Sequence, residues 1–377
     1  MAMQYRFSAP GRTEISGNHT DHQHGCVLAG AVNLETVADV QLNGEASIVV
    51  ESEGYPAISI DLNDIAVHDE DKNTTAALVR GVAAAFIQKG ESVKGFNVKA
   101  QSTVLPGSGL SSSAAFEVLI GTIINELFCE GRYTAIEIAQ IAQYAENVYF
   151  GKPCGLMDQM ASSVGGMVFI DFADPAQPKV EKIDFNFAEA GYALCIIDSG
   201  ADHADLTDEY GAIPNELAKV CGWFGKKVLR EISEAEFYKA LPDLRGHVSD
   251  RAILRAMHVY QENKRVLRQV EALRNGDFEA FLKLVTESGH SSWMYLQNIN
   301  PAGAVQQQPV ALALAMCDTL LQGRGAYRVH GGGFAGTVQA FVPNDMLNDF
   351  QREIETVLGE GSCHVLSIRQ AGGVRLQ

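Results

Sequence analysis

The sequence LPGSGLSSSAAFEVL, residues 105–119, decides the fold, because a glycine- and serine-rich segment runs directly into a helix-forming one. Gly107 and Gly109 can adopt backbone angles that other residues resist, and they let amide N–H groups approach an anion closely. The serines that follow stand where a helix begins, and the positive end of its dipole favours a phosphate. The stretch therefore predicts a phosphate loop. A plain glycine turn before an N-capped helix is the alternative, and no Walker-type Gly-Lys-Ser/Thr follows.

The bulk composition is that of a globular protein, and its length predicts two domains. The chain has 377 residues, of which 46% are hydrophobic and 20% charged. A net charge of −17 argues against a nucleic-acid or anionic-membrane partner. The N-terminus lacks the apolar core of a signal peptide, and seven scattered cysteines without a Cys-x-x-Cys pair suit a reducing compartment. We therefore expect a cytoplasmic protein.

Hydrophobic patterning predicts strands and helices in alternation. A short strand at residues 5–9 is expected to stop at Pro10, and a strand-like run covers 26–32. Further elements are predicted from the spacing of apolar residues, which recurs every 3.6 residues in a helix and every two residues in a strand. The strands are 37–42, 46–50, 58–62, 95–100 and 192–197, and the helices are 75–89, 115–128, 134–149 and most of 215–319.

The phosphate-loop pattern Pro-x-x-x-Gly-Leu-x-Ser-Ser-Ala-Ala resembles that of the GHMP small-molecule kinases, and the triple serine is most similar to galactokinases. The resemblance implies ATP as phosphoryl donor, with Mg²⁺. It implies nucleotide binding by the phosphate-loop residues Pro106, Gly107, Ser108, Gly109, Leu110, Ser111, Ser112, Ser113 and Ala114.

A second motif lies near the N-terminus, in GRTEISGNHTDHQHGCVL, residues 11–28. It is similar to the galactokinase pattern Gly-Arg-x-Asn-x-Ile-Gly-Glu-His-x-Asp-Tyr. The resemblance implies that Asn18, His19 and Asp21 hold the sugar and that Arg12 belongs to the catalytic group. The sequence departs from the pattern at four positions, Glu14 for Asn, Ser16 for Ile, Asn18 for Glu and His22 for Tyr.

Residues 17–25, the histidine loop, allow two other interpretations. His19, Asp21, His22 and His24 are side chains that suit zinc or iron. They are crowded into one loop, however, and no helical His-x-x-x-His presents them on one face. A hydrogen-bonded turn without ligand is the simpler alternative.

The third region, AENVYFGKPCGLMDQ, residues 145–159, resembles the galactokinase stretch Ala-Glu-His followed by Gly-x-x-Cys-Gly-Ile-Met-Asp-Gln. The resemblance implies that Glu146, together with Ser113, holds Mg²⁺, that Gly155 contacts the sugar and that Asp158 is the catalytic carboxylate. Taken alone, Glu146 could be a solvated helix charge and Asp158 a helix N-cap.

The C-terminal half carries weaker signals. An acidic stretch precedes the strand at 192–197, which places a domain boundary near Gly191, with domains 1–191 and 192–377. The resemblance implies that Tyr210 contacts the sugar. Residues 331–333, the glycine turn, match the family's C-terminal glycine motif. Family members carry aromatic adenine contacts where Thr75 and Leu78 stand, which puts the purine pocket of this chain in question.

Together these motifs imply a two-domain α+β GHMP kinase fold, with an N-terminal domain like domain 2 of ribosomal protein S5 and a ferredoxin-like C-terminal domain. They imply transfer of the ATP γ-phosphoryl group to the C1 hydroxyl of a hexose, most simply galactose. Asn18 leaves N-acetylgalactosamine, galacturonate and arabinose open as alternative sugars, and a non-catalytic sugar and ATP sensor is the alternative from another class. We expect a monomer or weak homo-oligomer.

Overall fold

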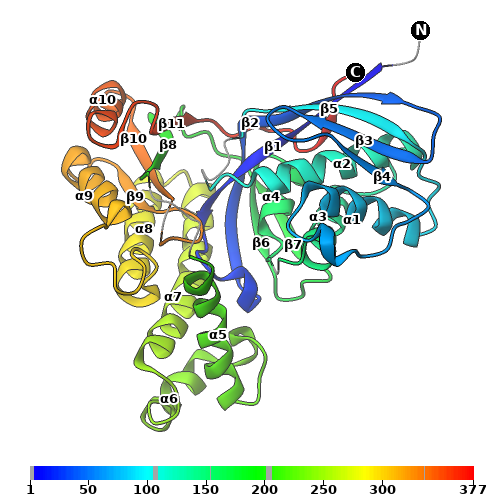
Figure 1. Cartoon of the computed structure of the whole chain (residues 1–377). Coiled ribbons are helices and arrows are strands. Elements are labelled where there is room, and N and C mark those ends of the chain that lie inside the picture. Colours follow the sequence, from blue (N-terminus) through cyan, green and yellow to red (C-terminus); the bar gives the residue numbers. More distant parts are fainter. Residues whose placement is uncertain (1–3, 105–108, 153, 201–205, 335) are drawn as a thin grey trace.

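The computed structural model describes residues 4–104, 109–152, 154–200, 206–334 and 336–377. Within them two β-sheets lie side by side, with helices packed on each (Figure 1). Among the described residues no helix is long and apolar enough to cross a bilayer. All seven cysteines are free.

The first sheet has the strand order β12-β1-β2-β5-β3-β4, and β6 and β7 extend it from β2. The second sheet has the order β11-β8-β10-β9. The predicted α+β architecture is therefore confirmed. The strands are β1 Gln4–Ser16, β2 Cys26–Leu42, β3 Ser47–Ser52, β4 Ile58–Asp61, β5 Phe96–Ser102, β6 Met167–Asp171, β7 Lys179–Ile183, β8 Tyr192–Asp198, β9 Ala326–Val329, β10 Thr337–Pro343, β11 Cys363–Leu366 and β12 Val374–Arg375.

The first two strands are longer in the structure than the sequence predicted. β1 continues past Pro10 because the pairing with β2 shifts register between Pro10 and Arg12, and a bulge tolerates a proline that cannot donate to the ladder. β2 joins two predicted strands into one, since its first half pairs with β6 and its second half with β5. The long β1–β2 pair therefore ends in the histidine loop, away from β3 and β4 (Figure 1).

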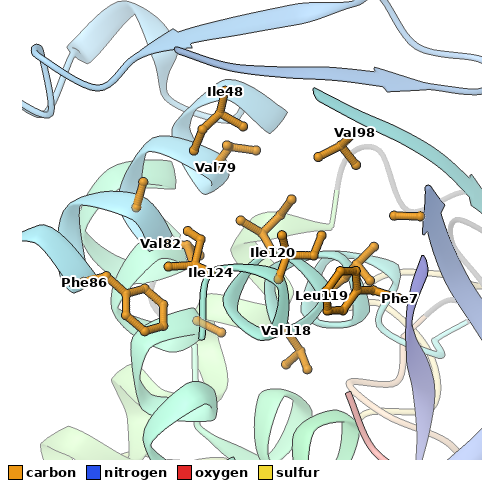
Figure 2. Packing of buried hydrophobic residues seen from close by; sticks show 14 of the residues in the cluster. Phe7, Ile48, Val79, Val82, Phe86, Val98, Val118, Leu119, Ile120 and Ile124 are labelled. Atoms are coloured by element: carbon orange, nitrogen blue, oxygen red, sulfur yellow. The ribbon is translucent and has the colours of Figure 1, made fainter. Parts of the chain in front are cut away.

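Four helices cover one face of the first sheet, α1 Thr75–Gln88, α2 Ser112–Phe128, α3 Ala135–Tyr144 and α4 Met157–Val164 (Figure 1). The apolar faces of α1, α2 and α3 bury a core that includes Val79, Phe86, Leu119 and Ile120 against Phe7 of β1 (Figure 2). Burying such side chains stabilises by roughly 1.5–3 kcal/mol each. The helix predicted over 134–149 is α3 followed by a π-helical turn, η3 Ala145–Phe150.

The remaining helices belong to the C-terminal half, α5 Thr207–Trp223, α6 Glu234–Leu244, α7 Asp250–Arg274, α8 Phe278–Ser291, α9 Pro309–Leu321 and α10 Leu347–Leu358. Short helical turns are η1 Asp21–Gln23, η2 Asp69–Asp71, η4 Leu229–Glu231 and η5 Ser292–Leu296. Helices α5 and α6 project from the body, and α7 runs from them up to the second sheet (Figure 1). The histidine loop lies between this helical part and α4 (Figure 1).

The last strand returns to the first sheet. β12 pairs with β1 through Phe7 and Ser8, so residues from both ends of the described chain share one sheet. One buried apolar cluster also takes Leu28 from the first sheet and Phe341 from the second. The predicted boundary near Gly191 thus falls between β7 and β8 in the chain, and a division into separately folding domains stays a prediction.

Candidate active site

Asp158 lies in the first turn of α4, where Arg12 of β1 holds its carboxylate with two hydrogen bonds. Arg12 Nε donates to Oδ1 at 2.7 Å, and Arg12 Nη2 donates to Oδ2 at 2.6 Å. Burial acts to raise the pKa of Asp158, but the charge and hydrogen bonds of Arg12 outweigh it, and the pKa lies below its ordinary value. Leu156 occupies the N-cap position, so Asp158 is not the helix cap. The site therefore contains an ionised carboxylate whose side chain is still 33% exposed.

The phosphate loop packs against the same carboxylate. Ser111 Oγ donates to Asp158, Arg12 Nη1 donates to the carbonyl of Gly109, and Arg12 N–H donates to the carbonyl of Leu110 at 3.0 Å. Ser111 is the N-cap of α2 in the left-handed conformation, yet its side chain makes no capping bond. The backbone amides at the start of α2 therefore lie beside Asp158 and receive no capping hydrogen bond from the Ser111 side chain. Leu110 and Ala114 are buried and Ser112 and Ser113 partly so, whereas Pro106, Gly107 and Ser108 lie outside the described residues.

Gly109 allows the phosphate loop to touch the second sheet. Its φ is +69°, and a Cβ there would lie 2.8 Å from Thr337 Oγ1 and 3.1 Å from His330 Nδ1. His330 is buried and accepts a hydrogen bond from the backbone N–H of Glu14 at Nε2, 3.2 Å away. Burial holds the pKa of His330 well below its usual range, so the ring is neutral. The two sheets therefore meet at the phosphate loop, through a contact that only glycine permits.

Glu146 is buried in η3, and three neighbours reach its carboxylate. Gln159 Nε2 donates at 2.7 Å, Cys154 Sγ lies at 3.2 Å, and Lys152 Nζ lies at 3.6 Å. The interpretation of Glu146 as a solvated helix charge is therefore wrong. Its carboxylate lies inside the protein, among polar neighbours.

A second buried acid stands next to Glu146. Gln159 Nε2 also donates to Glu117 of α2, at 3.2 Å, and neither Glu117 Oε1 nor Gln159 Oε1 has a hydrogen-bond partner among the described residues. Burial, and then the charge of Glu146, raise the pKa of Glu117 well above its ordinary value. Unsatisfied oxygens beside a second carboxylate fit Mg²⁺, which prefers oxygen ligands. Ser113, four residues before Glu117, adds a hydroxyl on the same side of α2.

The histidine loop does not assemble a transition-metal site. Among the described residues, which include the whole loop, no group of three or more His, Cys, Asp or Glu side chains is placed to hold a metal ion. Instead the loop packs against the glycine turn and α4.

Asn18 lies in a buried network that the sequence analysis did not foresee. Its Nδ2 donates to the carbonyl of Gly331 at 2.6 Å and to Glu14 at 3.0 Å, and its Oδ1 accepts from Asn298 at 2.9 Å. Glu14 in turn forms a buried ion pair with Arg328 at 2.5 Å. The sequence signal for this network was a paired change: the family has Asn where this chain has Glu14, and Glu where this chain has Asn18. It keeps one carboxylate and one amide in the network.

His19, Tyr210 and the glycine turn lie together. His19 Nε2 is 3.1 Å from the carbonyl of Gly332, and the Tyr210 hydroxyl donates to the carbonyl of Gly333 at 3.0 Å. A Cβ on Gly332 would lie 2.6 Å from the Tyr210 ring. The turn therefore lies between a histidine from the first sheet's loop and a tyrosine from α5.

The histidine loop also contacts the residues just before α4, where Asp21 meets Gly155. A Cβ on Gly155 would lie 1.7 Å from Asp21 Oδ2, so this carboxylate can occupy its place only against a glycine. Gly155 precedes α4, which carries Asp158 in its first turn.

A cavity of ≈ 370 Å³ opens beside the start of α2. Thr75 and Leu78, which stand where the family carries its aromatic adenine contacts, line it, and three aromatic residues from other segments line it too. These aromatic residues were missed because they lie outside the motif at the start of α1. They are Tyr55, Phe116 and Phe150, and Ser112 and Ser113 complete the wall toward the phosphate loop.

Comparison with protein families agrees with these motifs. Residues 77–166 match the N-terminal domain of GHMP kinases, and residues 2–42 match the galactokinase galactose-binding signature. The chain is 32% identical over 339 residues to a galactokinase of Streptomyces coelicolor, covering 89% of this chain and 84% of that one. It is 32% identical over 333 residues to a galactokinase of Thermotoga petrophila, covering 88% of each.

Solved structures share the fold. Lactococcus lactis galactokinase complexed with galactose superposes with a TM-score of 0.81 at 24% identity, over 99% of this chain and 95% of that one. A mevalonate kinase superposes with a TM-score of 0.68 at 15% identity, over 97% and 99% of the two chains.

Proposed function

The chain belongs to the galactokinase family of GHMP kinases, and from that premise we propose that Asp158 receives or orients the C1 hydroxyl proton of galactose while the γ-phosphoryl group of ATP is transferred. One observation carries this assignment. Ser111 at the start of α2 and Arg12 of β1 both bind the Asp158 carboxylate. The acceptor side and the phosphate side of the reaction would therefore share one cluster.

The chemistry needs alignment and charge neutralisation more than covalent participation of the protein. Asp158 is ionised and can accept a hydrogen bond from a sugar hydroxyl. Arg12 keeps the carboxylate ionised and adds positive charge close to the transferring group. The N-terminus of α2 contributes amide N–H groups toward the phosphates.

The nucleotide would occupy the phosphate loop and the adjoining cavity. Tyr55, Phe116 and Phe150 offer aromatic and apolar surface for the base, in place of the aromatic residues that the family carries at the start of α1. Ser113 and Glu146 would hold Mg²⁺, which supplies neutralisation of the triphosphate when bound.

The sugar would lie between Asp158 and the histidine loop. Asp21 and His19 present a carboxylate and an imidazole, groups that bind hydroxyls, and Gly155 leaves room for Asp21. Tyr210 lies against the glycine turn on the far side. Asn18 is fully buried, so we assign it to holding the glycine turn, with an indirect effect on the sugar.

We predict that Asp158→Asn lowers kcat by ~10²–10⁴-fold, because the neutral amide cannot accept the proton. The measurement is ADP release with galactose, ATP and Mg²⁺. The variant should still fold and bind nucleotide, since an asparagine amide has nearly the shape of the carboxylate and Asp158 does not cap α4. Its unfolding temperature should fall, because the buried Arg12 loses its anionic partner. Near wild-type turnover would remove Asp158 from this role.

The wild-type protein in the same assay decides the class of function. ADP formation that depends on a sugar excludes a non-catalytic sensor. A panel of galactose, N-acetylgalactosamine, galacturonate and arabinose, compared by kcat/KM, tests the substrate. We expect galactose to be best, because the exchange of residues 14 and 18 conserves one buried carboxylate in the network. Highest efficiency on another sugar overturns that choice.

We also infer a cytoplasmic setting, which the seven free cysteines support. A monomer or weak homo-oligomer is expected, and sedimentation velocity measures it.

A further inference from the structure

Three side chains of the histidine loop form a line of hydrogen bonds. Gln23 Nε2 lies 3.3 Å from His22 Nδ1, His22 Nε2 lies 3.2 Å from His19 Nδ1, and His19 Nε2 lies 3.1 Å from the carbonyl of Gly332. The two imidazole rings meet edge to face, with centroids 5.5 Å apart. The line runs from the helical part of the molecule to the glycine turn.

The Gly332 carbonyl and the Gln23 amide, at the two ends of this line, determine which nitrogen of each imidazole ring carries the proton. A carbonyl only accepts, so His19 carries its proton on Nε2 and its Nδ1 is an acceptor. His22 Nε2 must therefore be the donor to His19, which leaves His22 Nδ1 to accept from the Gln23 amide. The amide cannot be reversed, because Gln23 Oε1 accepts the backbone N–H of Leu229 at 3.0 Å. Both histidines are consequently neutral and protonated on Nε2.

The surroundings favour the neutral pair. Burial, followed by the neighbouring His22, lowers the pKa of His19 to about 3, and burial also lowers the pKa of His22. The groups that face the pair are Asp21 on η1, His258 and Arg255 on α7, and Tyr210 of α5 across the glycine turn. A proton added to His19 Nδ1 would point at the proton on His22 Nε2 and break the line.

We propose that His22 is a positioning residue for sugar binding, which acts by donating Nε2–H to His19 and so fixes the His19 ring and the glycine turn bound to it. This inference rests on the proposed function, in which His19 holds the sugar. It concerns a feature of this chain, since His22 stands where the galactokinase motif has tyrosine. A tyrosine hydroxyl can supply a hydrogen-bond donor in its place, whereas a phenylalanine ring cannot.

The pair His22→Phe and His22→Tyr tests the proposal, because the two variants differ by one hydroxyl. In His22→Phe the acceptor His19 Nδ1 is left without its donor, and we expect KM for galactose to rise about tenfold. KM for ATP and kcat should stay within about threefold of wild type. The acid limb of kcat/KM should move to higher pH, because the neighbour that opposes protonation of His19 is gone. His22→Tyr should keep both the KM and the acid limb near wild type.

Equal kinetics and equal pH profiles for the two variants overturn the proposal, since a role in packing alone would make them alike. Wild-type turnover separates the two ideas: without sugar phosphorylation by the wild type, the proposed function fails. The hydrogen-bond line then has its own test, which also covers variants that do not fold. In ¹⁵N-histidine spectra of the wild type at neutral pH, His19 and His22 should both be Nε2–H tautomers. A proton on Nδ1 of either ring contradicts the line.

Discussion

Glu14 and Asn18 show how the family's motif can change while its chemistry is kept. The family carries amide then acid at these positions, and this chain carries acid then amide. In the structure the two side chains are in direct contact. Glu14 pairs with the buried Arg328, and Asn18 donates to Glu14 and to Gly331, so an acid at position 18 alone would face two acceptors.

A double-mutant cycle on these two residues tests this coupling. Glu14→Asn leaves a buried guanidinium without its anion and should cost roughly 3–5 kcal/mol of unfolding free energy. Asn18→Glu should cost ~1–3 kcal/mol or more, because its carboxylate meets Glu14 and a carbonyl. The double variant restores the family's order and should be more stable than the sum by about 1–3 kcal/mol. Urea unfolding of the four proteins measures this, and strict additivity contradicts it.

At the scale of elements, the histidine loop and the start of α4 depend on one glycine. Asp21 lies where a side chain at residue 155 would be, so the distance between the loop and α4 is set by the absence of a Cβ. This contact also fixes the position of the proposed sugar carboxylate relative to Asp158.

We predict that Gly155→Ala raises KM for galactose by roughly ten- to a hundredfold, because the methyl group displaces Asp21. KM for ATP should change little, since the cavity beside α2 does not include Gly155. Gly222→Ala in α5 is the matched control. A Cβ there would meet nothing within 4 Å beyond its chain neighbours and its own helix backbone, and we expect unchanged kinetics and a slight gain in stability, roughly 0.5–1 kcal/mol. Wild-type sugar kinetics in Gly155→Ala would contradict the placement of Asp21.

The sequence predicts elements well where one period dominates, as in α1 and α2. It fails where local signals compete with the sheet. Pro10 looks like a strand end, but the bulge at Arg12 lets β1 continue and delivers Arg12 to Asp158. The helix predicted over 134–149 is present, but its last turn is the π-helical η3, in which Glu146 is buried.

At the scale of the whole molecule, Glu262 of α7 links segments from both halves of the chain. Its carboxylate pairs with Arg265 and accepts from Ser288 of α8 at 2.7 Å and from the backbone N–H of Gly17 at 3.2 Å. Burial acts to raise the pKa of Glu262, but Arg265 outweighs it and lowers the pKa to about 2. The base of the histidine loop is therefore attached to α7 by an ionised acid.

Because this attachment uses an ionised acid, it makes the free energy of unfolding depend on pH. The pKa of Glu262 is lower in the folded state, so its contribution is complete above its ordinary value of 4.5 and is lost as pH falls toward 2. We predict that Glu262→Gln lowers the unfolding free energy at pH 7 by on the order of 3 kcal/mol, and that its difference from wild type shrinks through this pH window. Urea unfolding as a function of pH measures it. The exposed Glu271 of the same helix is the control, and Glu271→Gln should match wild type throughout.

Much of the candidate site could be predicted because its motifs are local. Arg12, Ser111 and Asp158 each stand in a recognisable pattern, and the structure brings them together. The supporting residues could not be predicted, because they act by contact across distant segments. His330 touches Glu14 from the other sheet, and Gln23 matters through Leu229. Such pairings depend on how the two sheets meet, which no local period encodes.

The return of β12 to β1 has a consequence for synthesis on the ribosome. Translation makes β1 long before β12, yet Leu376 N–H donates to the carbonyl of Arg6 at 2.7 Å. A nascent chain that has emerged only as far as α4 can form the core in Figure 2, but one edge of β1 is still open. Open strand edges pair with other chains. Prematurely terminated products should therefore aggregate, while a chain that includes β12 closes its own seam.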